Sequence, residues 1–155
     1  MTETQRALDL AYSALNRRER TVCELRAYLE GKRVEPATIE AAVVQLERAG
    51  LLDDAGYARR FAEDKRTLER WGGERIEREL SRRGVAPDLV EAAMAERDRD
   101  GELAAALELL AEKFLDRPAD DRARDRAWRM LVRKGYAPEL AYDAVRAHAA
   151  GSRSP

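Results

Sequence analysis

One segment of the chain occurs three times at a fixed spacing, and this repetition constrains the fold more than any other feature. Residues 80–90 (LSRRGVAPDLV) align without a gap to residues 131–141 (LVRKGYAPELA), at an offset of 51 residues. The same offset in the other direction reaches residues 29–39 (LEGKRVEPATI), which keep a leucine, a valine and a proline in register. A repeat of this length is a supersecondary unit that buries its core by stacking on its neighbours. The chain is therefore predicted to contain three copies of one unit.

Each copy carries the residues of a tight turn between two helices. Gly84 and Gly135 suit the left-handed backbone position that follows a helix end. Pro36, Pro87 and Pro138 suit the first position of the next helix, where a missing N–H has no cost. The sequence therefore predicts helix, turn and helix in each copy. The first copy has arginine, residue 33, where the others have glycine, so its helix end is expected to differ.

A longer helix is predicted before each of these helix pairs. Apolar residues recur at helical spacing over residues 7–20, 54–70 and 102–116, and Asp53 or Asp54 is a candidate N-cap for the second of these helices. The prediction is an all-α fold of three tandem three-helix repeats that form an elongated curved body. The repeats are placed at residues 1–50, 51–99 and 100–150, with a flexible tail at 151–155.

The composition agrees with a helical fold and excludes a membrane protein. Charged residues make up 38% of the chain and aromatic residues 6%, and no apolar run approaches the roughly 20 residues that a membrane-spanning helix needs. The N-terminus lacks the pattern of a signal peptide, so a cytoplasmic protein is expected. The formal net charge is −1, from 29 basic and 30 acidic side chains, and bulk charge gives no reason to expect tight nucleic-acid binding.

The residues needed for catalysis or metal binding do not form a recognisable motif. Cys23 and His148 are the only cysteine and histidine, and they lie near opposite ends of the chain. Cys23 is expected to be a buried or half-buried side chain in a helix. The aspartate groups lack the spacing and the glycine of a calcium loop, and Gly72-Gly73 lacks the end of a phosphate-binding loop. We therefore expect no enzyme and no cofactor or metal.

Four groups of basic residues, together with Trp71, are the candidate partner-binding residues. Two of the groups occupy equivalent places immediately before a repeat turn, so they would recur along one surface. Arginine can bind phosphates and carboxylates through paired hydrogen bonds. The opposing interpretation is a solvated face, because the helix dipole favours cations near helix C-termini. The candidates are Arg17, Arg18, Arg20, Arg59, Arg60, Lys65, Arg66, Trp71, Arg82, Arg83, Arg133 and Lys134.

The two tryptophans are expected to differ in role. Trp71 precedes Gly72-Gly73, which is predicted to be a flexible loop between helices. At this place Trp71 is either a core residue or an exposed residue that binds a partner, since tryptophan is enriched in interface hot spots. Trp128 lies on an apolar stripe of its helix and is predicted to be structural.

Residues 50–61 (GLLDDAGYARRF) and several pairs that follow them resemble the central signature of the RecX family. The pairs are Lys65-Arg66, Gly72-Gly73, Arg75-Ile76, Glu79-Leu80 and Gly84-Val85, in the order that the family shows. The resemblance extends over the chain, because the triple repeat is similar to the three-helix modules of that family. The positions that carry the signature are Leu52, Asp53, Asp54, Tyr57, Phe61, Ile76, Leu80, Gly84 and Pro87. Most of them have the character of scaffold residues, with apolar side chains for packing and aspartates for capping.

The resemblance implies a regulator of DNA repair, homologous recombination and the SOS response. A RecX-like protein is expected to be a monomer that lies in the groove of the RecA–single-stranded DNA filament. It would inhibit ATP hydrolysis, strand exchange and co-protease activity, with weak contact to single-stranded DNA as a further expectation. Two alternatives stay open from the residues, namely an independent helical DNA-binding protein and a general helical-repeat scaffold.

Overall fold

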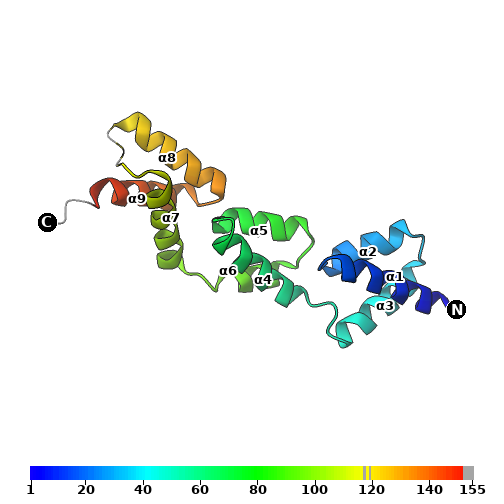
Figure 1. The fold of residues 1–155 in the computed structure, drawn as a ribbon. Helices are drawn as coiled ribbons and strands as arrows, with labels where there is room; N and C mark the ends of the chain where they lie inside the picture. Colours follow the sequence, from blue (N-terminus) through cyan, green and yellow to red (C-terminus); the bar gives the residue numbers. More distant parts are fainter. Residues whose placement is uncertain (117, 119, 152–155) are drawn as a thin grey trace. The chain divides into compact units, whose positions relative to one another are not determined.

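The structure, a computed structural model, describes residues 1–116, 118 and 120–151, and these residues form helices joined by short loops, with no strand among them. The elements are α1 (Glu3–Arg17), α2 (Val22–Gly31), α3 (Pro36–Arg48), α4 (Asp54–Thr67), α5 (Gly73–Arg82), α6 (Pro87–Met94), α7 (Arg99–Lys113), α8 (Asp121–Lys134) and α9 (Pro138–Ala150) (Figure 1). The prediction of an all-α fold is confirmed. The predicted flexible tail falls largely on residues 152–155, which lie outside the described residues.

The long first helix of each repeat starts at a side-chain cap. The Thr2 hydroxyl accepts a hydrogen bond from the Gln5 N–H, and the Asp98 carboxylate accepts one from the Gly101 N–H. These caps place the starts of α1 and α7 three or four residues before the predicted positions. Of the two candidate caps for α4, Asp53 has this role, because its carboxylate accepts a hydrogen bond from the Gly56 N–H at 3.1 Å.

The three repeat turns share one hydrogen-bond geometry. The backbone N–H groups of Val34, Val85 and Tyr136 donate to the carbonyl groups of the leucines five residues earlier, each at 3.1 Å. Gly84 and Gly135 have φ angles of 84° and 102°, as predicted for the left-handed position. The prediction that the first turn differs is wrong, because Arg33 has a φ angle of 62° and occupies the same position.

Replacing Arg33 with glycine is expected to raise the free energy of unfolding by about 0.5–1 kcal/mol. A side chain at a left-handed φ angle costs about 1 kcal/mol, and glycine removes that cost while adding some freedom to the unfolded chain. Urea unfolding followed by circular dichroism measures the change. Lys32→Gly is the matched control, because Lys32 has a φ angle of −90° and should lose stability. Equal losses in both variants would contradict the interpretation.

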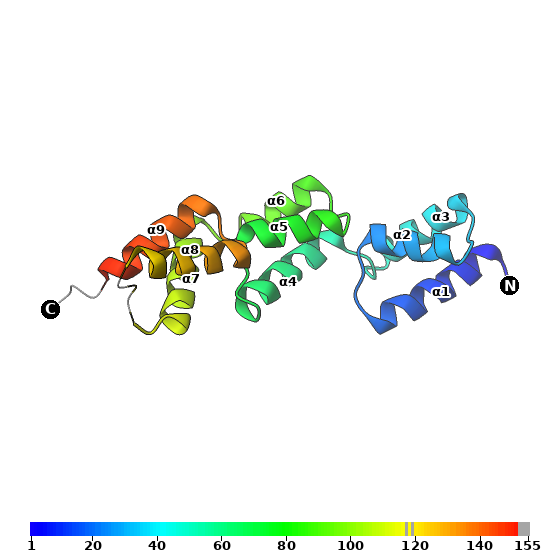
Figure 2. The same ribbon diagram turned by 90° about the horizontal axis from the view of Figure 1, so that it is seen from above.

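The chain divides into two compact units, and α4 and α5 contribute to both of them. Unit 1 comprises Met1–Arg60 and Leu80–Ala93, and unit 2 comprises Phe61–Glu79 and the chain from Met94 onward. In unit 1, α1, α2 and α3 pack on one another around a core of leucine, valine, isoleucine and alanine side chains (Figure 2). In unit 2, α7 and α8 both pack on α9, and the core includes the buried ring of Tyr136.

In unit 1 the loop before α2 lies against the turn between α5 and α6, a contact that we call the first junction. The fully buried Thr21 donates its hydroxyl hydrogen to the carbonyl oxygen of Arg83 at 2.7 Å. The Val22 N–H donates to the Asp54 carboxylate at 2.9 Å. Burial raises the pKa of Asp54 above its ordinary value, although the Val22 hydrogen bond and the charge of Arg26 oppose this effect.

In unit 2 the loop before α5 lies against the turn between α8 and α9, and this second junction repeats the first. The Gly72 N–H donates to the carbonyl oxygen of Lys134 at 2.8 Å, and the Gly73 N–H donates to the Glu102 carboxylate at 2.6 Å. Gly72, Gly73 and Lys134 lie 51 residues after Thr21, Val22 and Arg83. The prediction of a flexible loop at Gly72-Gly73 is therefore wrong, because backbone hydrogen bonds fix both glycines.

Each junction has an ion pair between its loop and a neighbouring helix, and the charge of the loop residue is reversed from one junction to the other. In the first junction Glu19 pairs with Arg60 of α4. In the second, Arg70, which lies 51 residues after Glu19, pairs with Glu112 and Glu108 of α7. The acidic partner lies in the loop in the first junction and in the helix in the second.

Among the residues that the structure describes, no loop of another repeat donates a backbone hydrogen bond to the turn between α2 and α3. The carbonyl oxygen of Lys32, which is equivalent to those of Arg83 and Lys134, accepts a hydrogen bond from the Arg6 guanidinium at 3.0 Å. At the other end of the series, the N–H of Ala123, 51 residues after Gly72, donates to the Asp120 carboxylate at 2.8 Å. The backbone groups equivalent to those that form the two junctions, namely the Lys32 carbonyl oxygen and the Ala123 N–H, therefore form hydrogen bonds within their own repeats.

Candidate functional site

Two basic residues, the predicted Lys65 and Arg75, which was not predicted, surround the ring of Trp71 in unit 2. The Lys65 Nζ lies 4.7 Å from the centroid of the Trp71 ring, and the Arg75 Cζ lies 4.0 Å from it. Phe61 packs edge-on against the same ring, with centroids 6.1 Å apart and an angle of 71° between the planes. Trp71 is half-buried, so it is both a packing residue and part of the surface. Cations within about 6 Å of an aromatic ring are attracted to its face.

The second junction brings two further predicted residues to this place, Lys134 and the backbone carbonyl group of Arg133. Lys134 donates from its Nζ to the carbonyl oxygen of Glu69 at 3.1 Å, and Arg75 donates to the carbonyl oxygen of Arg133 at 3.5 Å. The Trp71 N–H donates to the carbonyl oxygen of Lys65 at 2.9 Å, which closes the end of α4. We refer to Lys65, Trp71, Arg75, Arg133 and Lys134 as the Trp71 cluster.

A second group of cations surrounds Tyr28 in unit 1. The Arg17, Arg20 and Lys32 side chains lie 5.6, 5.1 and 5.6 Å from the centroid of its ring, and Arg17 also donates to the Tyr28 hydroxyl at 2.9 Å. We refer to these four residues as the Tyr28 cluster. Sequence reasoning did not identify the role of Tyr28 in gathering cations.

The other predicted basic residues are in different environments. Arg18 pairs with Glu24 at 3.3 Å, and Arg60 takes part in the first junction. Arg83 is half-buried and donates to the Tyr57 hydroxyl. Burial, with the nearby charge of Arg97 as the next cause, lowers the pKa of the half-buried Arg66. Arg59 and Arg82 are exposed.

The residues of the predicted family signature lie in the scaffold. Tyr57, Ile76, Leu80 and Leu52 are buried, and Phe61 is half-buried against Trp71. Asp53 and Asp54 accept backbone hydrogen bonds at the starts of α4 and α2, and Gly84 and Pro87 belong to the second repeat turn. A methyl group on Gly84 would overlap Cys23, so this glycine is needed for the first junction as well as for its φ angle. Cys23 is exposed, so the prediction of a buried or half-buried side chain is wrong.

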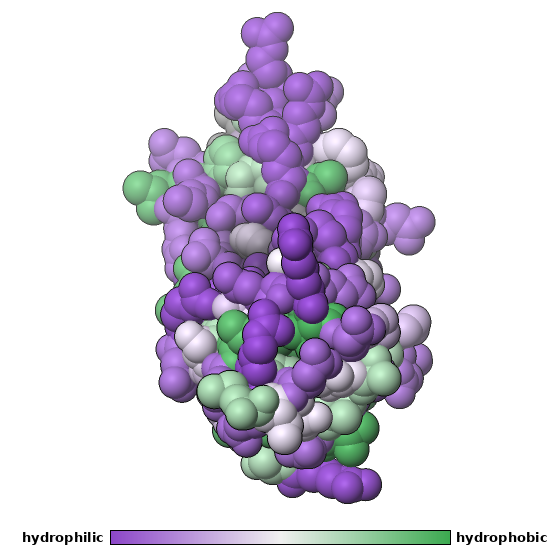
Figure 3. Space-filling view, turned by 90° about the vertical axis from the view of Figure 1, so that its right-hand side faces the viewer, coloured by the Kyte–Doolittle hydropathy of each residue, from purple (hydrophilic) through white to green (hydrophobic). Residues whose placement is uncertain are grey.

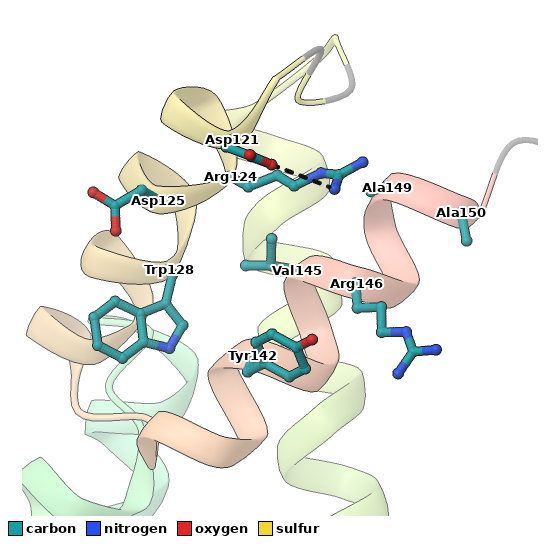
Figure 4. Close-up of a pocket in the computed structure, with 9 residues that line it drawn as sticks. All are labelled: Asp121, Arg124, Asp125, Trp128, Tyr142, Val145, Arg146, Ala149 and Ala150. Carbon is teal, nitrogen blue, oxygen red and sulfur yellow. Dashed lines mark ion pairs between the residues drawn. The ribbon is translucent and has the colours of Figure 1, made fainter.

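A groove of about 750 Å³ lies between α8 and α9. Trp128 comes from α8 and Tyr142 from α9, and we call these two residues the aromatic pair (Figure 4). The Trp128 indole N–H donates to the carbonyl oxygen of Pro138 at 3.0 Å, and Tyr142 is 61% exposed. The groove is also lined by Asp121, Arg124, Asp125, Val145, Arg146, Ala149 and Ala150.

Sequence reasoning missed this groove because Trp128 lies next to Ala127 and close to Leu131, which are both buried. Trp128 itself is only half-buried. The internal repeat contains the signal that could have found it, since the positions 51 and 102 residues before Trp128 are occupied by Glu77 and Arg26. Charged residues at both equivalent positions indicate that the position of Trp128 lies at the surface.

The surface is otherwise dominated by charge. The face in Figure 3 is covered mostly by hydrophilic residues, with separate hydrophobic ones among them. Within the described part of the chain, no group of three or more histidine, cysteine, aspartate or glutamate side chains lies together in a way that could hold a metal ion. No helix in that same part is both long enough and apolar enough to cross a membrane.

Comparison with known proteins identifies the family. The profile of the RecX first three-helix domain matches residues 7–46, and that of the RecX second three-helix domain matches residues 53–94. The regulatory protein RecX of Deinococcus radiodurans is 36% identical over 93% of this chain and 70% of its own length. That of Mycolicibacterium vanbaalenii is 32% identical, over 96% and 85%.

Solved structures agree in fold. The crystal structure of RecX from Lactobacillus salivarius superposes with a TM-score of 0.82 at 16% identity, covering 94% of this chain and 96% of that one. The helices, the two matching three-helix domains and the similarity to curated relatives lead to one conclusion. The chain belongs to the RecX family of regulatory proteins.

Proposed function

We propose that this protein binds the RecA–single-stranded DNA filament and inhibits its ATPase, strand-exchange and co-protease activities. Membership of a family of regulatory proteins is the observation that carries the proposal. The Trp71 cluster supports it, because an aromatic ring held between cations offers both apolar contact and charge to a partner. The protein would act as a monomer in the cytoplasm, as a regulator without catalysis or cofactor. Its repeats would be residues 1–50, 51–99 and 100–150.

The test of this function is the ATPase rate of RecA on single-stranded DNA as the purified chain is added. We expect the rate to fall as the chain approaches the concentration of RecA subunits. Filament binding measured in parallel by sedimentation should show saturation over the same range. Full ATPase activity with excess chain, and no co-sedimentation, would refute the proposal.

The place of the Trp71 cluster in this interaction has its own test. Arg133→Glu is expected to weaken filament binding about 5- to 10-fold, since a reversed charge at an interface costs affinity. Arg48→Glu is the matched control, because Arg48 is also an exposed arginine in the last turn of a helix but lies outside the cluster. Equal affinities of both variants and the wild-type chain would remove Arg133 from the interface.

Direct DNA binding is a second candidate function, and the Tyr28 cluster favours it. Three cations around one ring concentrate positive charge although the whole chain has a formal charge of −1. Phosphate contacts make affinity fall steeply with salt concentration. Fluorescence anisotropy with labelled single-stranded DNA over a salt series tests this function, and undetectable binding at low salt would exclude it.

A further inference from the structure

The groove between α8 and α9 contains two aromatic side chains, whereas the equivalent positions of the other repeats carry charged residues. The residues 102 positions before the aromatic pair are Arg26 and Glu40, which form a two-bonded ion pair at 2.9 and 3.0 Å. The residues 51 positions before it are Glu77 and Glu91, which are both exposed. The fold therefore accepts charged side chains at these two positions. An aromatic pair there is not required to build the repeat.

The face of α9 beside the groove has an ordered arrangement of charge. Glu139, Tyr142 and Arg146 follow one another at spacings of three and four residues, which places them on one side of the helix. The first two also line a shallower extension of the groove, and Arg146 lines its main part. The order along the helix is thus acid, aromatic and base.

The two charges at the ends of this face are available to a partner. Glu139 and Arg146 form no ion pair with any residue that the structure describes. The acidic residues of α8 in the groove differ from them, because Asp125 pairs with Arg129 at 2.9 Å and Asp121 lies 3.9 Å from Arg124. A charge without a partner beside an exposed apolar surface is suited to binding a complementary charge.

We propose that this groove binds an amphipathic helix of a protein partner. The helix would place an apolar side chain against the aromatic pair, a carboxylate against Arg146 and a basic side chain against Glu139. The α9 helix has 13 residues and is about 20 Å long, so it can support a partner helix of three turns with contact residues at spacings of three, four and seven. Three aspartates and a glutamate line the groove and its extension, against two arginines, and this excess of negative charge opposes the phosphates of a nucleic acid. A protein segment is therefore the occupant that the charges favour.

The test rests on the proposed function, because it uses the RecA–single-stranded DNA filament as the partner. Tyr142→Glu is expected to lower the affinity for the filament about 10- to 30-fold, since it places a charge in the apolar centre of the contact. The Tyr142 side chain is 61% exposed, so urea unfolding should change little. Tyr12→Glu is the matched control, because Tyr12 is an exposed tyrosine on α1 and should keep wild-type affinity.

The charges of the partner helix are tested by Arg146→Glu and Glu139→Arg. Each should weaken binding several-fold, as expected for a repulsive charge at an interface. If the wild-type chain binds the filament and the Tyr142→Glu variant binds it equally well, the inference is overturned and the proposed function stays intact. A wild-type chain that does not bind the filament would contradict the proposed function and, with it, this choice of partner.

Two further measurements separate the other possible occupants. If Tyr142→Glu weakens binding to single-stranded DNA alone as much as binding to the filament, the groove is a nucleic-acid site and the inference is wrong. If analytical ultracentrifugation shows a dimer of the wild-type chain that Tyr142→Glu dissociates, the occupant is a second copy of the chain and the inference is again wrong. We expect the wild-type chain and the Tyr142→Glu variant both to be monomers. We also expect the substitution to weaken binding to the filament and not binding to single-stranded DNA alone.

Discussion

Replacing Gly135 with alanine is expected to lower the free energy of unfolding by about 2–4 kcal/mol. Gly135 has a φ angle of 102°, which costs a residue with a side chain about 1 kcal/mol. A methyl group there would also overlap the Cβ of Arg75 and lie 2.8 Å from its backbone nitrogen, so the second junction would have to open or shift. Overpacking of this kind adds about 1–3 kcal/mol. Urea unfolding followed by circular dichroism gives the change in free energy.

Gly50 provides the control that separates the two causes. Its φ angle is 75°, but a methyl group at this position would have no atom within 4 Å. Gly50→Ala should therefore cost only the backbone contribution of about 1 kcal/mol. Equal losses at Gly50 and Gly135 would show that the second junction contributes nothing to the effect.

Replacing Thr21 with valine is expected to lower the free energy of unfolding by about 2–3 kcal/mol. The Thr21 hydroxyl accepts a hydrogen bond from the Glu24 N–H as the N-cap of α2 and donates one to the carbonyl oxygen of Arg83. Loss of the cap costs about 1 kcal/mol. The carbonyl oxygen of Arg83 would also lose the Thr21 donor in a buried contact, which adds about 1–2 kcal/mol.

Thr2→Val is the matched control for this prediction. Thr2 is the N-cap of α1 and accepts a hydrogen bond from Gln5, but it is exposed, and its side chain makes no hydrogen bond beyond its own helix among the described residues. Its loss should cost about 1 kcal/mol or less. Thr21→Ser keeps the hydroxyl and should retain most of the stability. A serine variant as unstable as the valine variant would show that the methyl group, and not the hydroxyl, is the important part.

The local structure of this fold can be predicted from the sequence, because the signals are local. A glycine past a helix end and a proline three residues later specify the turn, and the 51-residue repeat provides the same evidence more than once. The first turn shows the limit of the approach. Arg33 has no local reason to take a positive φ angle, and it does so because the hydrogen bond from Val34 to Leu29 closes the same turn.

The junctions could not be predicted in the same way, because they join residues about 60 positions apart. Thr21 and Arg83, like Gly72 and Lys134, have no periodic pattern that relates one to the other within a copy. As a consequence, sequence reasoning treated Gly72-Gly73 as a flexible loop. The glycines are needed there for close approach, since a methyl group on Gly72 would lie 2.5 Å from backbone atoms at Gly135 and Tyr136.

Only part of the candidate site could be predicted, because the contacts of its side chains also depend on residues that are distant in the sequence. A basic residue in the sequence does not indicate whether an acid lies beside it in the fold, and Arg18 and Arg60 are both engaged in ion pairs. Trp71 and Lys65 were both candidates, and the structure brings them together, but Arg75, which covers the ring, was not among the candidates. Its role depends on the second junction and could not be derived from its position in α5.

The first repeat turn also differs from the other two in what it offers to a neighbouring loop. Gly84 and Gly135 lack a side chain where the loop of the preceding copy approaches, whereas Arg33 carries one, and Arg6 already occupies the carbonyl oxygen of Lys32. A further loop at this turn would have to displace the Arg6 guanidinium from the carbonyl oxygen of Lys32 and accommodate the Arg33 side chain, so a third junction of the same geometry cannot form there without rearrangement.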